Sequence, residues 1–395
     1  MKKATQQQTK EHNRNLVLRT IFDYEKISRA EIARITGLTR TTVSDIVSEF
    51  MEDGLVDEVG LGQSLGGKNP ILLSLVEDSR YLIGLDLAQT EFKGAVVNLR
   101  GKIRSLTSHP VNNRSGKEAL NAIYEILDRL VGNELQPIVG IGVGTPGLVN
   151  AKEGVVVNAV NLDWQNLPLS QLLQDRYNLP AYVLNDSQAA AMGEYTFGEG
   201  HSAENNLVVI NVRQGIGAGI IIDQRLFQGD GGGAGEIGHI VVVPEGGQRC
   251  RCGNYGCLET VASSKALIRE AKRLAERSEG IFPTSRDIDL ESIHRAYQAE
   301  NPLVQQIVMT SAHFMGIAIS SLVETLNIQK IVLSGDVTWY GQPWLDLVQE
   351  TISRNSLSGL ARDTRVSFGT LDENGIILGA SASLANNYPM LLLSQ

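Results

Sequence analysis

Residues 236–259 read EIGHIVVVPEGGQRCRCGNYGCLE and contain all three cysteines of the chain, Cys250, Cys252 and Cys257. His239 lies eleven positions before the first of them. Three thiolates and one imidazole form a Cys3His set, which suits the closed tetrahedral shell of a structural zinc ion. Three buried thiols without a metal are the alternative, since free cysteine is commonly buried. Because every cysteine falls in one short glycine-rich loop, and a disulfide would leave an odd cysteine over, the stretch predicts zinc in a reducing compartment.

The chain has 395 residues, of which 42% are hydrophobic and 20% are charged. These values are typical of a soluble globular protein with two or three domains. No apolar run approaches the roughly 20 residues of a membrane span, and the N-terminal MKKATQQQTKEHNRN lacks the hydrophobic core of a secretory signal. We therefore expect a cytoplasmic protein without a membrane partner.

The net charge of −9 is unevenly distributed. Residues 1–75 contain ten Lys/Arg and ten Asp/Glu, so the remainder of the chain carries the whole −9. Within the first segment most basic residues precede most acidic ones. A basic face on a neutral segment is compatible with DNA binding, although this electrostatic signal alone is weak.

Residues 1–75 have the pattern of three helices followed by a hairpin. Apolar residues at helical spacing predict a helix from Thr9 to about Tyr24. Ser28 and Glu31 match a capping box at the start of a second helix. Gly37 breaks the chain, and Thr39 can cap a third helix that runs to Asp53.

The third helix begins with polar side chains that lie off its apolar stripe, which is typical of a recognition helix in the major groove. Two strands around a glycine-rich tip predict a wing, which argues against the alternative of a small helical bundle with a solvated polar end. Arg29 is expected to be a phosphate contact or a solvated charge rather than a base reader, because phosphate contacts outnumber base contacts. The candidate DNA-binding residues are Arg29, Thr39, Arg40, Thr41, Thr42, Ser44, Gly66, Gly67 and Lys68.

Two further patterns lead to a family. G-E-x-G-H at 235–239 followed by C-x-C-G-x-x-G-C-x-E at 250–259 resembles the ROK family of sugar kinases and sugar-responsive repressors. LNDSQAAAMGE (184–194) and GIGAGII (215–221) are similar to further motifs of that family, and the resemblance covers about residues 81–385. The segment from 28 to the wing also resembles the winged helix-turn-helix that opens ROK repressors.

The resemblance implies an α/β protein in which an N-terminal winged helix-turn-helix precedes a duplicated actin-like, ROK sugar-kinase fold in two lobes. A repeated order of predicted strands and helices, from residue 81 and again from residue 206, agrees with a duplication. We expect the DNA-binding domain at 1–75, the first lobe at 81–197 and the second lobe, with the zinc knuckle, at 198–374. A C-terminal helix within 375–390 is expected to return to the first lobe.

By the same resemblance, a sugar would lie between the lobes. Its hydroxyls would be bound by Gly147, Asn161, Asn185, Asp186, Glu236, His239 and Glu259. Asp186 matches the base of the family's kinases. His239 would serve zinc with one ring nitrogen and the sugar with the other, as ligand histidines usually bond a second partner.

The nucleotide elements of the family's kinases are altered. Backbone N–H groups can cradle phosphates only where glycine leaves room for them. The kinases carry Asp-x-Gly-Gly-Thr in the first hairpin turn, whereas residues 86–90 here read DLAQT. Gly-Thr-Gly at the second turn is replaced by Arg213-Gln214-Gly215, and a glycine pair or triplet near the adenosine by Ser334-Gly335-Asp336. We therefore expect no ATP cofactor and no catalytic residue, with Asp186 as a vestigial base.

The resemblance implies a sugar-responsive transcriptional regulator, a repressor of sugar uptake or catabolism genes. It would bind an inverted-repeat operator in double-stranded DNA as a homodimer or homotetramer, and a small-molecule sugar would release or modulate it. The alternative is an active sugar kinase with an appended DNA-binding domain, because Asp186 is retained. A scaffold with a vestigial sugar site is a third reading. Pentose, hexose and acetylated amino sugar all remain open.

Overall fold

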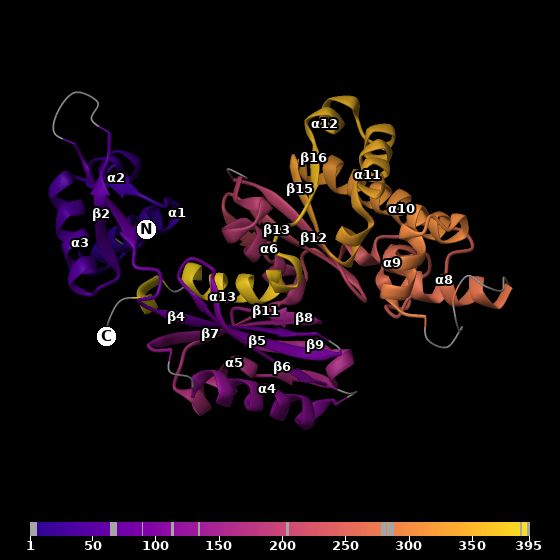
Figure 1. The fold of residues 1–395 in the computed structure, drawn as a ribbon, viewed down its shortest axis with the longest axis horizontal. Helices are drawn as coiled ribbons and strands as arrows, with labels where there is room; N and C mark the ends of the chain where they lie inside the picture. The colour runs from indigo at the N-terminus through magenta and orange to yellow at the C-terminus, as the bar shows by residue number, and fades with distance from the viewer. Residues whose placement is uncertain are drawn as a thin grey trace.

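The N-terminal DNA-binding segment lies at one side of the molecule, beside two lobes that carry the rest of the chain (Figure 1). The computed structural model describes residues 6–63, 69–88, 90–111, 114–132, 135–202, 205–277, 282, 288–387 and 389–392. Three predicted DNA contacts, Gly66, Gly67 and Lys68, lie outside these described residues.

The N-terminal segment is a winged helix-turn-helix. Its elements are α1 (Gln6–Asp23), β1 (Ile27–Ser28), α2 (Arg29–Thr36), α3 (Arg40–Glu52), β2 (Val56–Leu61) and β3 (Ile71–Leu75). The strands form an antiparallel sheet in the order β1-β3-β2. The capping box of Ser28 and Glu31 is present, Gly37 ends α2 with φ 72°, and Thr39 caps α3. The local cap and turn signals of the sequence are thereby confirmed.

The first lobe is built on a five-stranded sheet in the order β11-β7-β4-β5-β6. Helix α13 packs on β4 and β7, while α4 packs on β5 and β6 (Figure 1). The close approach of α13 requires glycine in the strands: a Cβ at Gly84 or Gly142 would lie 2.1 Å from a carbonyl oxygen of α13. A small sheet, β10-β9-β8, stands beside it. The elements are β4 (Tyr81–Leu87), β5 (Glu91–Asn98), β6 (Ile103–Pro110), α4 (Gly116–Val131), β7 (Ile138–Thr145), β8 (Leu148–Asn150), β9 (Val155–Ala159), η1 (Val160–Leu162), β10 (Trp164–Leu167), α5 (Leu169–Tyr177), β11 (Ala181–Asn185) and α13 (Gly375–Asn387).

The second lobe repeats this plan with the order β14-β13-β12-β15-β16. Strand β12 occupies the place that β4 has in the first lobe, with an antiparallel neighbour on one side and a parallel one on the other. The predicted duplication is confirmed. The elements are η2 (Glu199–Ser202), β12 (Leu207–Val212), β13 (Ile216–Ile222), β14 (Arg225–Phe227), η3 (Ile237–His239), α7 (Glu259–Ala262), α8 (Ser264–Arg277), α9 (Leu290–Gln298), α10 (Pro302–Leu326), β15 (Lys330–Gly335), η4 (Asp336–Tyr340), α11 (Gly341–Asn355), α12 (Ser358–Asp363), β16 (Arg365–Phe368) and η5 (Asp372–Asn374).

Helix α10 is the one helix in the described parts of the chain that is long and apolar enough to cross a membrane. It lies in the core of the second lobe, where Val304, Val308 and Met315 are fully buried, and it packs along α11. Its apolar character is therefore that of a core helix in a folded lobe.

The chain passes between the lobes twice. Helix α6 (Asp186–Phe197) begins at the end of β11 in the first lobe and contacts β12 and β13 of the second. Helix α13 then brings the chain back and packs along α6 (Figure 1). These two helices form the connection between the lobes.

The core of the winged helix-turn-helix is shared with the rest of the protein. Leu82 of β4, Leu99 and three C-terminal residues belong to the same buried cluster as Ile21, Ile32, Val47 and Phe50; these three are Leu384, Ala385 and Leu392. Arg100 donates to the carbonyl oxygens of Phe22 and Tyr24 at 2.6 and 3.0 Å. On the other side, Arg19 of α1 donates to Gln224 of the second lobe at 3.2 Å.

Candidate functional site

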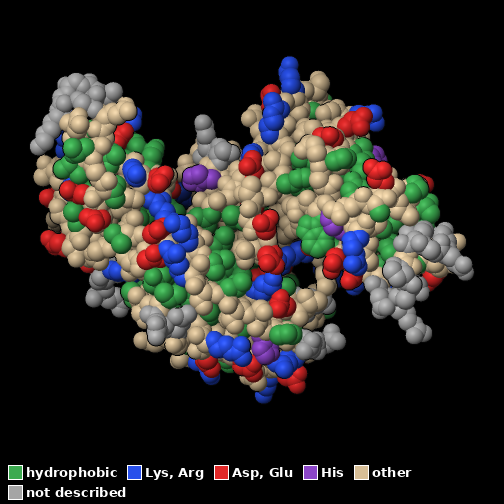
Figure 2. All heavy atoms as spheres, viewed as in Figure 1, with side chains coloured by type: hydrophobic (Ala, Val, Ile, Leu, Met, Phe, Trp, Pro, Cys, Tyr) green, Lys and Arg blue, Asp and Glu red, His purple; other side chains and the backbone are tan. Residues whose placement is uncertain are grey.

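A cleft of about 1010 Å³ lies between the lobes. In the space-filling view, carboxylates and cations lie close together along this hollow (Figure 2). The structure brings all the sugar-binding candidates to its wall: Gly147, Asn161, Asn185 and Asp186 from the first lobe side, and Glu236, His239 and Glu259 from the second. Such convergent polar groups in a large cleft are typical of a small-molecule site.

Asn185 and Asp186 are held at the junction of β11 and α6. The Asn185 side chain caps α6, because its Oδ1 accepts from Ser187 N at 2.9 Å. Its Nδ2 donates to the Gly147 carbonyl at 2.9 Å. Gly147 has φ 94°, and a Cβ there would lie 2.3 Å from Asn158 O, so glycine is required at this contact. The residues on this wall are thus fixed before any ligand binds.

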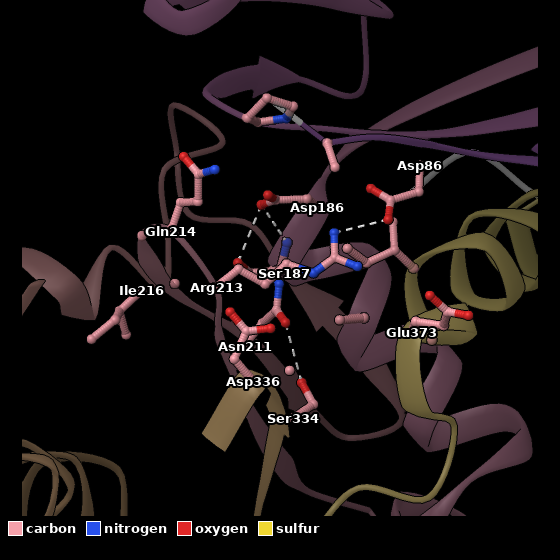
Figure 3. Close-up of a pocket in the computed structure, with 18 of the residues that line it drawn as sticks. Asp86, Asp186, Ser187, Asn211, Arg213, Gln214, Ile216, Ser334, Asp336 and Glu373 are labelled. Atoms are coloured by element: carbon pink, nitrogen blue, oxygen red, sulfur yellow. Dashed lines mark hydrogen bonds and ion pairs between the residues drawn. The ribbon is translucent and has the colours of Figure 1, made fainter. Parts of the chain in front are cut away.

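Asp186 faces a charged group from the opposite lobe. Arg213 Nη1 lies 2.8 Å from Asp86 Oδ2, and the guanidinium stands between Asp86 and Asp186 (Figure 3). Burial raises the pKa of Asp186 to about 6; the Asp86 carboxylate adds to the rise, whereas Arg213 and the hydrogen bonds from Ser187 oppose it. Burial also raises the pKa of Asp86, against the effect of Arg213.

The altered nucleotide turns are occupied by their own side chains. Arg213 lines the cleft and reaches from one hairpin turn to Asp86 at the other. Asp336, at the position of a lost glycine, accepts a hydrogen bond from the Ser264 hydroxyl. Both features place carboxylates and a bound guanidinium where a polyanion would need open N–H donors. Gln89, a further altered position, lies outside the described residues.

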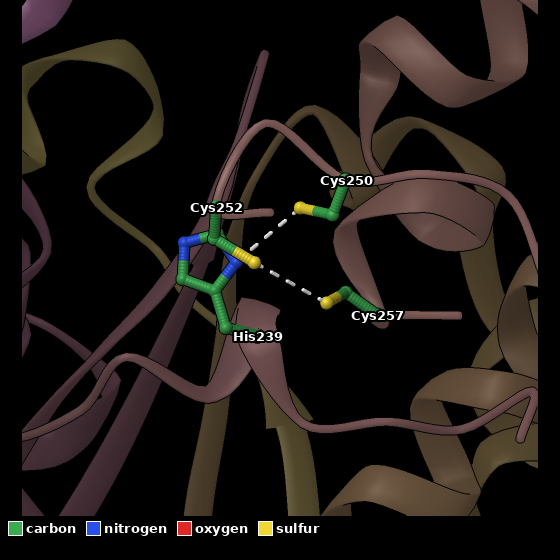
Figure 4. Close-up of side chains that lie close together, drawn as sticks. All are labelled: His239, Cys250, Cys252 and Cys257. Carbon is green, nitrogen blue, oxygen red and sulfur yellow. Dashed lines mark hydrogen bonds between the residues drawn. The ribbon is translucent and has the colours of Figure 1, made fainter. Parts of the chain in front are cut away.

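The Cys3His candidates converge on one point (Figure 4). The three Sγ atoms and one ring nitrogen of His239 all lie within 4.8 Å of one another. Cys252 and Cys257 are separated by 3.7 Å between Sγ atoms, and Cys250 Sγ lies 3.5 Å from His239 Nδ1. Tetrahedral zinc with Zn–S bonds of about 2.3 Å implies S···S distances of about 3.8 Å. The donor set and its spacing fit zinc.

His239 faces in two directions. Its Nδ1 points to the thiols, while its Nε2 lies 3.8 Å from Glu236 Oε2 in the cleft. Glu259 begins α7, accepts from Ile216 N at 3.2 Å and pairs with Arg251 Nε at 3.1 Å. The metal candidates and the cleft therefore share one imidazole.

On the winged helix-turn-helix, the candidate DNA-binding residues differ in exposure and in the hydrogen bonds that they already make within the protein. Arg40 and Thr41 are exposed at the start of α3, and Ser44 is half-buried. Thr39 and Thr42 bond each other through their hydroxyls at 2.9 Å. Arg29 is engaged within the protein, since Nη1 donates to Glu58 at 2.9 Å. Arg40 and Thr41 are thus the members of the set best placed to reach a groove.

Some residues of the site were not predicted from the sequence. The pairing of Arg213 with Asp86 joins positions 127 apart, and no local pattern indicates it. Glu194 of α6 accepts from Thr370 N and Leu371 N at 3.1 and 3.2 Å, which ties the two interlobe crossings together. Glu194 does stand in the LNDSQAAAMGE motif, and that is the signal that could have drawn attention to it.

Comparison with known proteins agrees with this architecture. Residues 82–387 match the ROK family, and residues 11–57 match a family described as winged helix-turn-helix DNA-binding. A xylose repressor of Caldicellulosiruptor bescii is 32% identical over 388 residues, which cover 96% of this chain and 96% of the relative.

Two solved structures resemble this chain over different parts of its length. A ROK family transcriptional regulator, described as a homologue of the E. coli MLC protein, has a TM-score of 0.84 at 26% identity and covers 97% of this chain and 98% of its own. A ROK family glucokinase from Streptomyces griseus, in complex with glucose and AMPPNP, has a TM-score of 0.69 at 29% identity and covers 76% of this chain and 98% of its own. Because the family match spans most of the sequence and the repressor relative spans nearly all of it, the chain belongs to the ROK family.

Proposed function

We propose that this protein is a sugar-responsive DNA-binding repressor whose winged helix-turn-helix occupies an operator and whose interlobe cleft binds the effector. The observation that carries the proposal is the contrast within one cleft. The sugar-binding candidates of both lobes line it together, whereas Arg213 and Asp336 occupy the turns that a nucleotide would need. Similarity to a xylose repressor over nearly the whole length of both chains supports the same function.

The effector is proposed to be a sugar held by Gly147, Asn161, Asn185, Asp186, Glu236, His239 and Glu259. Carboxylate and amide oxygens accept hydrogen bonds from hydroxyls, and the Asn185 amide and His239 ring can donate. Since a relative is named xylose repressor, D-xylose is the first sugar to test. A hexose or an acetylated amino sugar would use the same donors and acceptors.

We further propose that His239, Cys250, Cys252 and Cys257 hold a structural zinc ion. The ion would fix the loop that carries Arg251 and set the orientation of the His239 ring. Its contribution is structural, and every contact to the sugar is made by residues of the protein.

For DNA, we propose that Arg40, Thr41, Thr42 and Ser44 enter a major groove while Arg29 and the wing residues Gly66, Gly67 and Lys68 approach the backbone. A two-fold dimer, or a pair of dimers, would match an inverted-repeat operator, because helix-turn-helix dimers read half-sites one helical turn or more apart.

An active sugar kinase is the second candidate, because Asp186, which matches the base of the family's kinases, is retained and lines the cleft. The glucokinase with glucose and AMPPNP shares the two lobes, but this chain has a guanidinium between its two hairpin turns. A kinase of this class turns over at roughly 1–100 per second.

One experiment tests the two candidates together. We expect D-xylose, D-glucose or N-acetyl-D-glucosamine to raise the melting temperature of the full-length protein, since a ligand of the native state stabilises it. The same sugar should weaken binding to an operator selected from random-sequence DNA, and a coupled assay with Mg-ATP should give no turnover. Sugar-dependent ATP consumption at the rate of a kinase would contradict the proposal that the protein acts only as a repressor. If none of the three sugars raises the melting temperature, none of them is the effector.

The pH dependence of sugar binding follows from Asp186. Its pKa is raised to about 6, so the carboxylate is ionised at pH 7.5 and mostly protonated at pH 5. If the ionised form accepts the sugar hydroxyl, affinity is nearly full at pH 7.5, falls by about half at pH 6 and falls by about tenfold at pH 5. Calorimetry at both pH values checks this. Asp186→Asn should bind more weakly and without this pH step, and an equal step in that variant would assign it to another group.

A further inference from the structure

Among the described residues two ion pairs join the lobes across the cleft, Lys93 with Glu373 and Arg213 with Asp86, and the second is the one with a buried carboxylate. Asp86 is the penultimate residue of β4 in the first lobe, and Arg213 begins the turn after β12 in the second. These turns occupy equivalent places in the two repeats, and Arg213 Nη1 spans the space between them to Asp86 Oδ2 at 2.8 Å (Figure 3).

Each partner is fixed within its own lobe. Asp86 pairs with Lys93 of β5 and with Gly144 of β7 in the sheet register, so its backbone cannot shift alone. Arg213 N donates to Gly215 O at 2.9 Å, and Arg213 O accepts from Ser264 N at 3.0 Å. The ion pair therefore restrains the distance between the two lobes at these turns.

The pair is desolvated and charge-assisted. Asp86 is 2% exposed, and its Oδ1 is buried with no hydrogen-bond partner among the described residues. Asp186 and Asp336 also lie near enough to act on the Arg213 charge. Without Arg213, three carboxylates would face one another across the cleft, and their repulsion would favour opening.

We propose that the Arg213–Asp86 ion pair is a latch that holds the two lobes near the closure at which sugar contacts from both sides reach one ligand. This rests on the proposed sugar site. Where glycine-rich turns leave room for phosphates, a bound nucleotide can contact both lobes. In this chain the Arg213 guanidinium makes a contact between the lobes. The pair is a positioning device, and it touches no sugar.

The latch predicts a population effect. Apparent affinity falls in proportion to the fraction of molecules in the binding-competent state. If breaking the pair leaves about a tenth of the molecules near closure, D-xylose affinity falls about tenfold. The sugar-free protein should also expand, because the lobes separate about α6 and α13.

The test compares full-length Asp86→Asn, Arg213→Gln and their double variant with the parent, using D-xylose calorimetry and the radius of gyration of the sugar-free protein from solution X-ray scattering. Each single variant should bind D-xylose about tenfold less tightly and have a larger radius of gyration. The double variant should bind D-xylose at least as tightly as the single variant with the lower affinity. Arg176→Gln is the matched control, because it breaks an ion pair with Asp128 that lies wholly within the first lobe, at 2.9 Å.

Parent-like affinity and dimensions in both single variants would overturn the latch, as would single losses that multiply in the double variant. Arg213→Lys covers the case in which the neutral variants do not fold, because it keeps the positive charge but not the planar guanidinium. Its radius of gyration should lie above that of the parent, by less than a complete loss of the ion pair would cause. An unchanged radius of gyration would contradict the proposal. If the parent does not bind D-xylose, the choice of effector fails, while scattering from the sugar-free proteins still decides on the latch.

Discussion

Replacing Cys252 with serine should abolish most of the effect of the sugar on operator binding while leaving operator binding itself at the level of the parent protein. Cys252 is an exposed member of the Cys3His set, and its Sγ makes no contact with the sugar candidates beyond the cluster. In the proposed zinc site, loss of one ligand would weaken metal binding and free the His239 ring, whose Nε2 faces Glu236 in the cleft. Sugar affinity should fall by tenfold or more.

Operator binding should persist because the helix-turn-helix is stabilised elsewhere. Its buried cluster is formed with β4, Leu99 and the C-terminal residues and contains nothing from the 236–259 stretch. Zinc content by elemental analysis and operator anisotropy with and without D-xylose measure both halves of the prediction. Tyr255→Ser, which changes an exposed side chain of the same loop and removes no ligand, is the control. A normal sugar response despite measured zinc loss would show that the cysteine loop is only a local staple.

Arg40→Ala should weaken binding to the specific operator by about 5- to 150-fold, which corresponds to the roughly 1–3 kcal/mol of a lost bidentate base contact. Arg40 is exposed at the first turn of α3, and no hydrogen bond or ion pair within the described residues engages its guanidinium. It is therefore free to reach a base edge. Thr42→Ala should act in the same direction with a smaller loss, since its hydroxyl already bonds Thr39.

The comparison that identifies a base contact is the ratio between specific and random DNA. Arg29→Ala removes a phosphate candidate held by Glu58, and it should lower affinity for both DNAs alike. Arg40→Ala should lower only the specific affinity. Equal binding of Arg40→Ala and the parent to both DNAs would mean that the groove-facing side of α3 has been assigned incorrectly.

Features encoded in neighbouring residues were predictable from the sequence. The capping box of Ser28 and Glu31 and the end of the second helix at Gly37 depend on local backbone chemistry, and the structure has both. The duplicated sheets followed from repeated order and from family resemblance. The site was predicted as a set of residue types, and the structure gathers that set at one cleft.

Contacts between distant segments could not be predicted. The sequence shows Arg213 as a departure from the second phosphate turn and Asp86 as a retained residue of the first, and only the approach of the two lobes makes them partners. Arg29 looked free for phosphate until the wing brought Glu58 to it. In both cases the sequence specifies the charge, and the tertiary fold decides what neutralises it.

The cluster that joins the winged helix-turn-helix to Leu82, Leu99 and the C-terminal residues has a consequence for exchanging parts between repressors. A chimera cut at the polar junction near residue 78 would leave half of a hydrophobic interface facing side chains selected for another partner. Transplanting the operator specificity of a relative therefore requires its matching residues at Leu82, Leu99, Leu384, Ala385 and Leu392, or substitution confined to the exposed start of α3. By the same reasoning, a kinase that acquires such a head must also acquire a complementary surface, so fusion of two genes is only the first step toward a regulator.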